Sequence, residues 1–130
     1  MSKRVLVVDD HKPTRAMIRA IIESEKSDKF EVVEAGDGQE CLTRFDGEGP
    51  FDLVVLDVDM PVMDGYAACR ALRERDRKVP ILFVTASREM KDYAAGRAAG
   101  GDSYLVKPVA RAALRSLVAL FTSVRRPAER

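Results

Sequence analysis

The sequence lacks the features of a secreted protein, of a membrane protein and of a protein with a cysteine-ligated metal site. Among 130 residues there are two cysteines, one histidine and no tryptophan, and Cys41 and Cys69 lack the spacing of a metal site. Because both lie in helix-like segments, we expect reduced, buried thiols in a cytoplasmic protein. The apolar run near the N-terminus covers residues 5–8 and is too short for a signal peptide core or a membrane span. We therefore expect no membrane association.

An excess of charge of either sign is also absent. The 22 basic residues against 21 acidic ones leave a net charge of +1, so the overall field favours neither nucleic acid nor an anionic membrane surface. The charged stretch at residues 70–78 indicates a solvated helical face, with Arg70, Arg73, Glu74 and Arg77 exposed, rather than a nucleic-acid patch. A length of 130 residues fits one domain with a substantial core.

Short apolar runs alternate five times with helical patterns. Strands are predicted at residues 5–8, 30–35, 53–56, 81–84 and 104–106, and each is followed by residues at helical spacing. Five such units predict an α/β fold, a doubly wound five-stranded parallel sheet with five helices on its two faces. In the flavodoxin-like strand order 2-1-3-4-5, ligands bind beyond the carboxyl ends of the strands, where the order reverses.

Particular residues predict where the helices begin and which helix yields most easily. Pro13 suits the first turn of the first helix, and His11 before it is interpreted as a loop or cap residue rather than a metal ligand. Asp64 and Ser87 are the predicted caps of the third and fourth helices. Gly96 stands inside the fourth helix and costs about 1 kcal/mol relative to alanine. This helix is therefore predicted to be a marginal element that yields easily.

Reactive side chains stand where the predicted strands end. Asp9 and Asp10 follow the first strand, Asp57 the third, Thr85 the fourth and Lys107 the fifth. Because the carboxyl ends of parallel strands lie at one edge of a sheet, we expect these side chains to meet there.

Such a cluster predicts metal-assisted phosphoryl chemistry. Three neighbouring carboxylates repel one another unless a cation joins them, and Mg²⁺ is the hard divalent ion that suits them best. A carboxylate beside such an ion is also able to attack phosphorus and form an acyl phosphate. Lys107 would add a second positive charge, and Thr85 a hydroxyl donor.

Four stretches of the sequence carry a resemblance to a known family. They read VLVVDDHKPTR, DLVVLDVDMPVMDG, ILFVTA and AAGGDSYLVKP, in this order along the chain. Over residues 3–122 the sequence resembles a response regulator receiver domain (CheY-like) of bacterial two-component signalling. The resemblance implies a receiver domain at residues 3–122, and a C-terminal tail or the start of a linker at residues 123–130.

The resemblance also implies a function for individual residues. Asp57 would accept a phosphoryl group from a phosphohistidine of a histidine kinase or phosphotransfer protein. Thr85 and Lys107 would hold the phosphoryl oxygens, and Tyr104 would be the switch aromatic that acts with Thr85. Such a domain catalyses only its own phosphorylation and dephosphorylation.

A magnesium site is implied by the same resemblance. Asp57 and Asp10 would bind the ion directly, Asp9 mainly through water, and Asp59 through its backbone carbonyl. The output would be a change in binding to a downstream protein target, which the sequence does not identify. The expected output face is formed by the fourth helix, the fifth strand and the fifth helix.

Two other functions remain as alternatives at this point. The first is a pseudo-receiver, which binds partners without being phosphorylated. The second is a small phosphatase with an aspartate nucleophile, because residues 57–59 read DVD and resemble the nucleophile motif of haloacid dehalogenase-like phosphatases. That motif places a threonine two residues beyond the second aspartate, where this chain has Pro61, so the phosphatase is the weaker alternative.

Overall fold

Five parallel strands form one sheet in the order β2-β1-β3-β4-β5. A computed structural model describes residues 2–123. Residues 124–130 of the predicted tail lie outside this range. The elements are β1 (Ser2–Val8), α1 (Lys12–Glu23), β2 (Lys29–Ala35), α2 (Gly38–Glu48), β3 (Leu53–Asp57), α3 (Gly65–Arg75), β4 (Ile81–Thr85), α4 (Met90–Ala99), β5 (Ser103–Val106) and α5 (Arg111–Ser123). The predicted fold class and strand order are confirmed.

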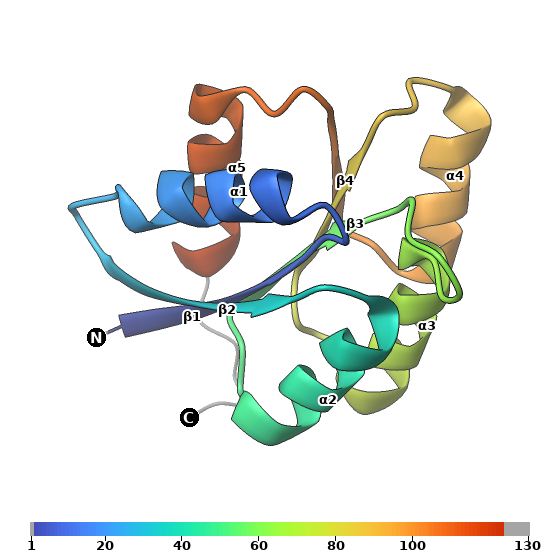
Figure 1. The fold of residues 1–130 in the computed structure, drawn as a ribbon, viewed down its shortest axis with the longest axis horizontal. Helices are drawn as coiled ribbons and strands as arrows, with labels where there is room; N and C mark the ends of the chain where they lie inside the picture. The colour runs from blue at the N-terminus through green and yellow to red at the C-terminus, as the bar shows by residue number, and fades with distance from the viewer. Residues whose placement is uncertain (1, 124–130) are drawn as a thin grey trace.

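The helices cover both faces of the sheet (Figure 1). Alternate strand residues such as Leu6 and Val54 pack with α2, α3 and α4, whereas their neighbours Val5 and Val55 pack with α1 and α5. Successive side chains of a strand point to opposite faces. Because both faces are buried, the strands read as continuous apolar runs in the sequence.

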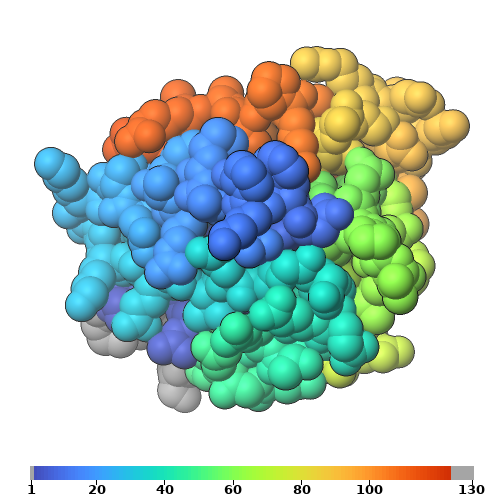
Figure 2. Space-filling model, in the orientation of Figure 1, coloured from blue at the N-terminus to red at the C-terminus, as the bar shows by residue number. Residues whose placement is uncertain are grey.

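Helices α1 and α5 lie side by side over one face. In Figure 2 the blue atoms of the N-terminal third lie directly against the orange atoms near the C-terminus. Hydrogen bonds add to this packing, since Arg111 donates to Ser24 at 2.9 Å and Arg115 to Glu25 at 3.4 Å. The C-terminal helix is thereby joined to the end of the first one.

The helix caps agree with the sequence predictions in two places and disagree in one. His11 caps α1 by accepting from the Thr14 N–H through Nδ1, and Asp64 caps α3 by accepting from Ala67 at 2.9 Å. Ser87 does not cap α4, which begins only at Met90, so that prediction is wrong. Its hydroxyl instead donates to the Asp92 carboxylate at 2.5 Å, because a serine three residues before a helix faces its first turn.

Arg73 also differs from its predicted exposure. Its guanidinium donates to the carbonyls of Gly100 at 2.9 Å and Val79 at 2.7 Å, and to the Asp102 carboxylate at 2.9 Å. These bonds join α3 to the segments before β4 and after α4, and they leave 17% of the side chain exposed. A long side chain on a helix surface reaches such partners only after the helices pack.

Both cysteines are free and buried, as predicted. Burial raises the pKa of the Cys69 thiol to about 11 and that of Cys41 to about 12, so both stay protonated near neutral pH. Within residues 2–123, no helix combines the length and the apolar character that crossing a membrane requires.

Candidate functional site

Four neighbouring strands bring the predicted site residues to one edge of the sheet. Asp9 directly follows β1, Asp57 and Thr85 are the last residues of β3 and β4, and Lys107 directly follows β5. The register aligns these ends, since Val8 pairs with Leu56, Asp57 with Val84, and Thr85 with Val106. The parallel arrangement therefore assembles the site, as the strand ends predicted.

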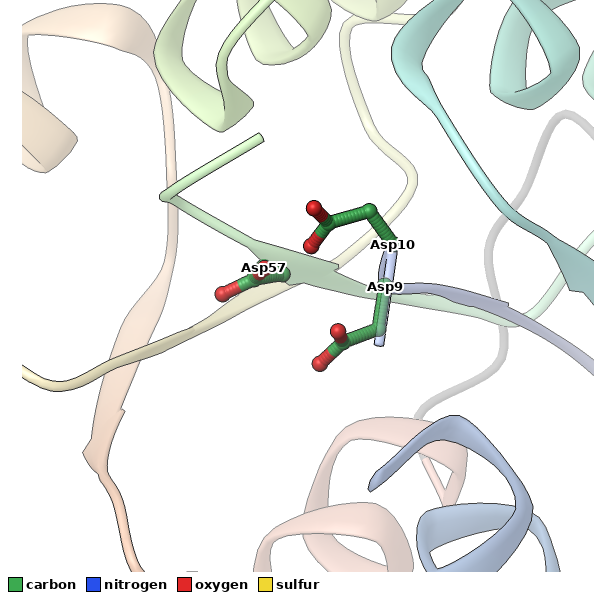
Figure 3. Close-up of side chains that lie close together, drawn as sticks. All are labelled: Asp9, Asp10 and Asp57. Atoms are coloured by element: carbon green, nitrogen blue, oxygen red, sulfur yellow. The ribbon is translucent and has the colours of Figure 1, made fainter. Parts of the chain in front are cut away.

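Three carboxylates form the centre of this edge (Figure 3). One oxygen from each of Asp9, Asp10 and Asp57 lies within 4.8 Å of the others. Asp9 and Asp57 are buried, with 1% and 2% of their surfaces exposed, whereas Asp10 is exposed to solvent. Buried carboxylates this close to one another need a compensating cation.

Lys107 supplies one such positive charge. Its ammonium lies 3.1 Å from Asp57 Oδ1 and 3.3 Å from Asp9 Oδ2, although the residues are 50 and 98 positions apart in the sequence. Burial by itself lowers the pKa of Lys107, but the bonds to Asp57 and the charges of both carboxylates raise it above its usual value. The lysine is therefore a permanent cation at this edge.

The surroundings of Asp57 disfavour the ionised form of its carboxyl group. Burial, and then repulsion by Asp9, raise the pKa of Asp57 from the ordinary 3.8 to about 6, against the opposing effect of Lys107. A positively charged group that binds at this strand end would therefore stabilise the ionised Asp57 carboxylate.

The loop after β3 folds back on this carboxyl. The Asp59 N–H donates to the Asp57 carboxylate, and the Gly65 N–H donates to the Val58 carbonyl at 2.8 Å. A Cβ at Gly65 would lie 2.3 Å from the Asp57 carbonyl oxygen, so only glycine lets α3 begin this close to the strand. The Asp59 side chain is exposed to solvent, and the predicted metal ligand of this residue is its backbone carbonyl.

A known protein family matches the sequence that forms this site. The sequence profile described as "Response regulator receiver domain" matches residues 5–119. The chain belongs to this family.

Similar receiver domains occur in transcriptional regulators and in a chemotaxis protein. The chain is 44% identical over 121 residues to the probable transcriptional regulator ycf27 of Cyanophora paradoxa. The matched region covers 89% of this chain and 48% of that protein. It is 38% identical over 108 residues to the regulatory protein PhoP of Bacillus subtilis, covering 83% of this chain and 43% of the relative. The chain thus spans about half the length of these curated relatives, which are named as regulators and not as enzymes.

A solved structure confirms the likeness at the level of the fold. The chemotaxis protein CheY4 of Vibrio cholerae superposes with a TM-score of 0.86 at 30% identity, over 93% of this chain and 99% of that one. In the receiver domain described here, Asp9, Asp10 and Asp57 are positioned as in the family, whose members bind Mg²⁺. Hard oxygen donors around a partly solvated cluster also suit this ion by their own chemistry.

A chain of hydrogen bonds links Thr85 to Tyr104 in this receiver domain. Thr85 Oγ1 accepts from the Ser87 N–H at 3.2 Å, and the Ser87 hydroxyl donates to Asp92. The Tyr66 hydroxyl donates to the Asp92 carbonyl at 2.9 Å and lies 2.7 Å from the Tyr104 hydroxyl. The two predicted switch residues are therefore connected through the first turn of α4.

Tyr66 and Asp92 are the members of this chain that the sequence did not indicate. Tyr66 lies 38 positions before Tyr104, and no spacing rule pairs them. The Tyr104 ring is partly buried beneath α4, and its centroid lies 5.9 Å from the centroid of the Phe83 ring. A Cβ at Gly96 would lie 3.1 Å from Cε1 of the Tyr104 ring. Glycine inside α4 therefore makes room for the aromatic ring as well as weakening the helix.

The raised pKa of Asp57 predicts a pH-dependent stability of the metal-free receiver domain. Well below pH 3.8 the carboxyl is protonated in the folded and unfolded chains alike, so it has no effect on stability. As the pH rises from about 4 to about 6, the unfolded chain ionises this group while the folded chain resists its ionisation, so stability is lost over this range. We expect Asp57→Asn to raise the free energy of unfolding at pH 7, in chelator, by on the order of 2 kcal/mol.

Urea unfolding at pH 4 and pH 7 measures this difference. The gain from Asp57→Asn should shrink to a small fraction of this value at pH 4, and Asp59→Asn, which changes an exposed carboxylate two residues away, should give little gain at either pH. An equal gain from Asp57→Asn at both pH values would show that the pKa of Asp57 is not raised.

Proposed function

We propose that this receiver domain is a phosphorylation-activated switch with Asp57 as its phosphoacceptor. The observation that carries the proposal is the buried Asp57 carboxylate, held at a strand end 3.1 Å from the Lys107 ammonium and beside two further carboxylates. This arrangement gives a nucleophile a fixed direction and provides positive charge where phosphoryl oxygens would arrive. The phosphodonor would be a phosphohistidine of a histidine kinase or phosphotransfer protein.

In the proposed reaction, a carboxylate oxygen of Asp57 attacks phosphorus as the bond from phosphorus to the donor imidazole breaks. The product is an acyl phosphate on Asp57 and a free histidine on the donor. Lys107 would exchange its bond to Asp57 for one to a phosphoryl oxygen, and the buried Thr85 hydroxyl would donate to another. The domain promotes only its own phosphorylation and dephosphorylation in this scheme.

Mg²⁺ is the proposed cofactor of this site. Asp10 and Asp57 would bind it directly, Asp9 mainly through water, and Asp59 through its backbone carbonyl. When bound, the ion neutralises negative charge on the carboxylates and on the phosphoryl group. Asp9 is already oriented for an indirect role, because its carboxylate accepts from the His11 N–H at 2.8 Å and from Lys107 at 3.3 Å.

The proposed partners and location follow from the family. The upstream partner would be the kinase or phosphotransfer protein, and the downstream partner a protein that binds the face of α4, β5 and α5. Because the curated relatives are named transcriptional regulators, we propose that the output serves the control of transcription, without nucleic acid or membrane binding by this domain. A cytoplasmic location agrees with the free thiols of Cys41 and Cys69.

We propose residues 3–122 as the receiver unit and residues 123–130 as a tail or the start of a linker. The alternative of a pseudo-receiver is less well supported, because a module without phosphoryl transfer has no need for Lys107 to contact both Asp9 and Asp57. A phosphatase of the second alternative is disfavoured by the family match over residues 5–119.

Incubation of the purified chain with acetyl phosphate tests the function directly. With Mg²⁺ present, the intact mass should increase by one phosphoryl group, and the product should be labile to base, as acyl phosphates are. A chelator should prevent the increase. A chain that gains no phosphoryl group in the presence of Mg²⁺ would contradict the switch and favour the pseudo-receiver.

Phosphorylation is expected to change the structure mainly within residues 85–107. A phosphoryl group on Asp57 offers oxygens that would accept from the Thr85 hydroxyl and draw it toward Asp57. This movement would disturb the contact of Thr85 with the Ser87 N–H and, through Ser87, the bonds to Asp92, Tyr66 and Tyr104. Helix α4 yields because its N-cap residue makes no side-chain cap bond. Amide exchange with and without beryllofluoride, a phosphoryl mimic, should differ most in this range.

Two tyrosine variants provide a matched control for this prediction. Tyr66→Phe removes the hydroxyl that joins Asp92 to Tyr104 and should reduce the exchange difference at residues 103–106. Tyr93→Phe keeps the ring that packs on Tyr104 with centroids 5.6 Å apart and should leave the difference unchanged. Largest differences in α1 or α2 would contradict the proposed output face.

A further inference from the structure

Arg15 lies outside the proposed set of site residues, yet its side chain reaches the end of β1. Its Nη1 donates to the Asp9 carbonyl at 2.8 Å, and its Nε donates to Glu34 Oε1 at 2.7 Å. Only 16% of the side chain is exposed. A guanidinium buried to this extent is held in one place by its partners and contributes a fixed direction as well as a charge.

The contact with the Asp9 carbonyl acts on the residue that links the strand to the metal cluster. The Asp9 N–H donates to the Ala35 carbonyl at 3.1 Å, and the Asp9 carboxylate is held by His11 and Lys107. Its carbonyl, which Arg15 holds, belongs to the same rigid peptide unit as the Asp10 amide nitrogen. The direction of this carbonyl therefore sets the direction in which Asp10 leaves the strand.

Glu34 holds Arg15 in position and offsets its charge. The two oxygens of this carboxylate accept from Arg15 and from Arg19, the latter at 2.8 Å. Hydrogen bonds from Arg19 and Arg15 lower the pKa of Glu34, so the carboxylate stays ionised. Arg19 shares this partner but turns its other bond to Glu23 at 3.0 Å, and 41% of its side chain is exposed.

We propose that Arg15 is a positioning residue for the Mg²⁺ site, which orients the Asp10 carboxylate through the peptide between Asp9 and Asp10. This inference rests on the proposed function. Arg15 is cationic and cannot be a ligand, and its charge alone would weaken the binding of another cation. An improvement of Mg²⁺ binding by Arg15 must therefore come from geometry, and this separates its role from general electrostatics.

Arg15→Met and Arg19→Met form the matched pair that tests this role. Each removes one guanidinium from the same carboxylate, and only the first loses the contact with Asp9. We expect Arg15→Met to raise the half-saturating Mg²⁺ concentration about tenfold, as the loss of groups that orient metal ligands does. Arg19→Met should stay within about twofold of the wild type, because surface substitutions of this kind have small effects.

Two readouts separate positioning from a general loss of structure. Mg²⁺ titration of the metal-free protein, followed by the amide resonance of Asp10, gives affinity without any reaction. The rate of phosphorylation by acetyl phosphate against Mg²⁺ concentration should show a shifted midpoint for Arg15→Met and a nearly unchanged rate at saturation. Equal Mg²⁺ affinity in the two variants, or tighter binding by Arg15→Met, would overturn the proposal.

A second variant covers the case in which Arg15→Met does not fold. Arg15→Lys keeps the positive charge but lacks the forked donors that hold Glu34 and the Asp9 carbonyl together, and it should raise the half-saturating Mg²⁺ concentration in the same direction. An unchanged midpoint in this variant would also count against Arg15. If the wild type neither binds Mg²⁺ nor accepts a phosphoryl group, the proposed function itself fails. If the wild type does both and the variants match it, only the role of Arg15 is lost.

Discussion

Asp57→Asn is expected to abolish phosphorylation by acetyl phosphate while the domain remains folded. The amide has the same shape as the carboxylate but is not a nucleophile toward phosphorus. Asp57 is 2% exposed and lies beside Asp9 and Lys107, so a change of shape would disturb the core, whereas asparagine preserves it and relieves repulsion by Asp9. Intact mass after incubation with acetyl phosphate and Mg²⁺ should show a phosphoryl group on the wild type only.

Asp59→Asn is the matched control for this experiment. It changes an exposed carboxylate of the same loop and retains the backbone carbonyl that is proposed to serve the metal. This variant should still take up one phosphoryl group, with a lifetime that differs from that of the wild type if the Asp59 carboxylate acts on the attacking water. Stoichiometric labelling of Asp57→Asn would rule out Asp57 as the sole acceptor.

Asp10→Ala is expected to produce the largest loss of Mg²⁺ affinity among single substitutions of exposed residues. Asp10 contributes an exposed carboxylate whose oxygen lies within 4.8 Å of those of Asp9 and Asp57, and Mg²⁺ uses only one or two carboxylates of this kind. We expect its loss to weaken binding by well over tenfold, because removal of groups that merely orient ligands already costs about 10- to 100-fold. Stability should change by less than about 0.5 kcal/mol.

Asp59→Ala and Ser87→Ala serve as controls in the titration. The first removes a nearby exposed charge but keeps the proposed carbonyl ligand, and the second removes a hydroxyl that binds Asp92 rather than the cluster. Both should bind Mg²⁺ at least several times more tightly than Asp10→Ala. The same affinity for Asp10→Ala and Asp59→Ala would contradict the coordination proposed here and point to a general effect of charge.

Much of the fold is visible in the sequence because its signals are local. The runs at residues 5–8 and 53–56 are continuous and apolar, as strands covered on both faces must be, and Asp64 and Pro13 mark helix starts through bonds or backbone angles within one turn. The prediction of a cap at Ser87 is wrong because a serine shortly before a helix resembles a cap in the sequence, whether or not it lies at the N-cap position. The prediction of an exposed Arg73 is wrong because its partners, Gly100 and Asp102, lie in a distant segment between α4 and β5.

Local sequence patterns are enough to show which side chains end the strands, and therefore that one edge of the sheet carries Asp9, Asp10, Asp57, Thr85 and Lys107. This follows because parallel strands place their carboxyl ends together, whatever the details of packing. The partners that these groups contact depend on how the helices and strands pack together. The contacts of Lys107 with Asp57 and of Tyr66 with Tyr104 span 50 and 38 positions, and Arg15 reaches the Asp9 carbonyl across the turn between β1 and α1. A long side chain can bind many different groups, and the packing of the helices on the sheet determines which of these groups lies within reach.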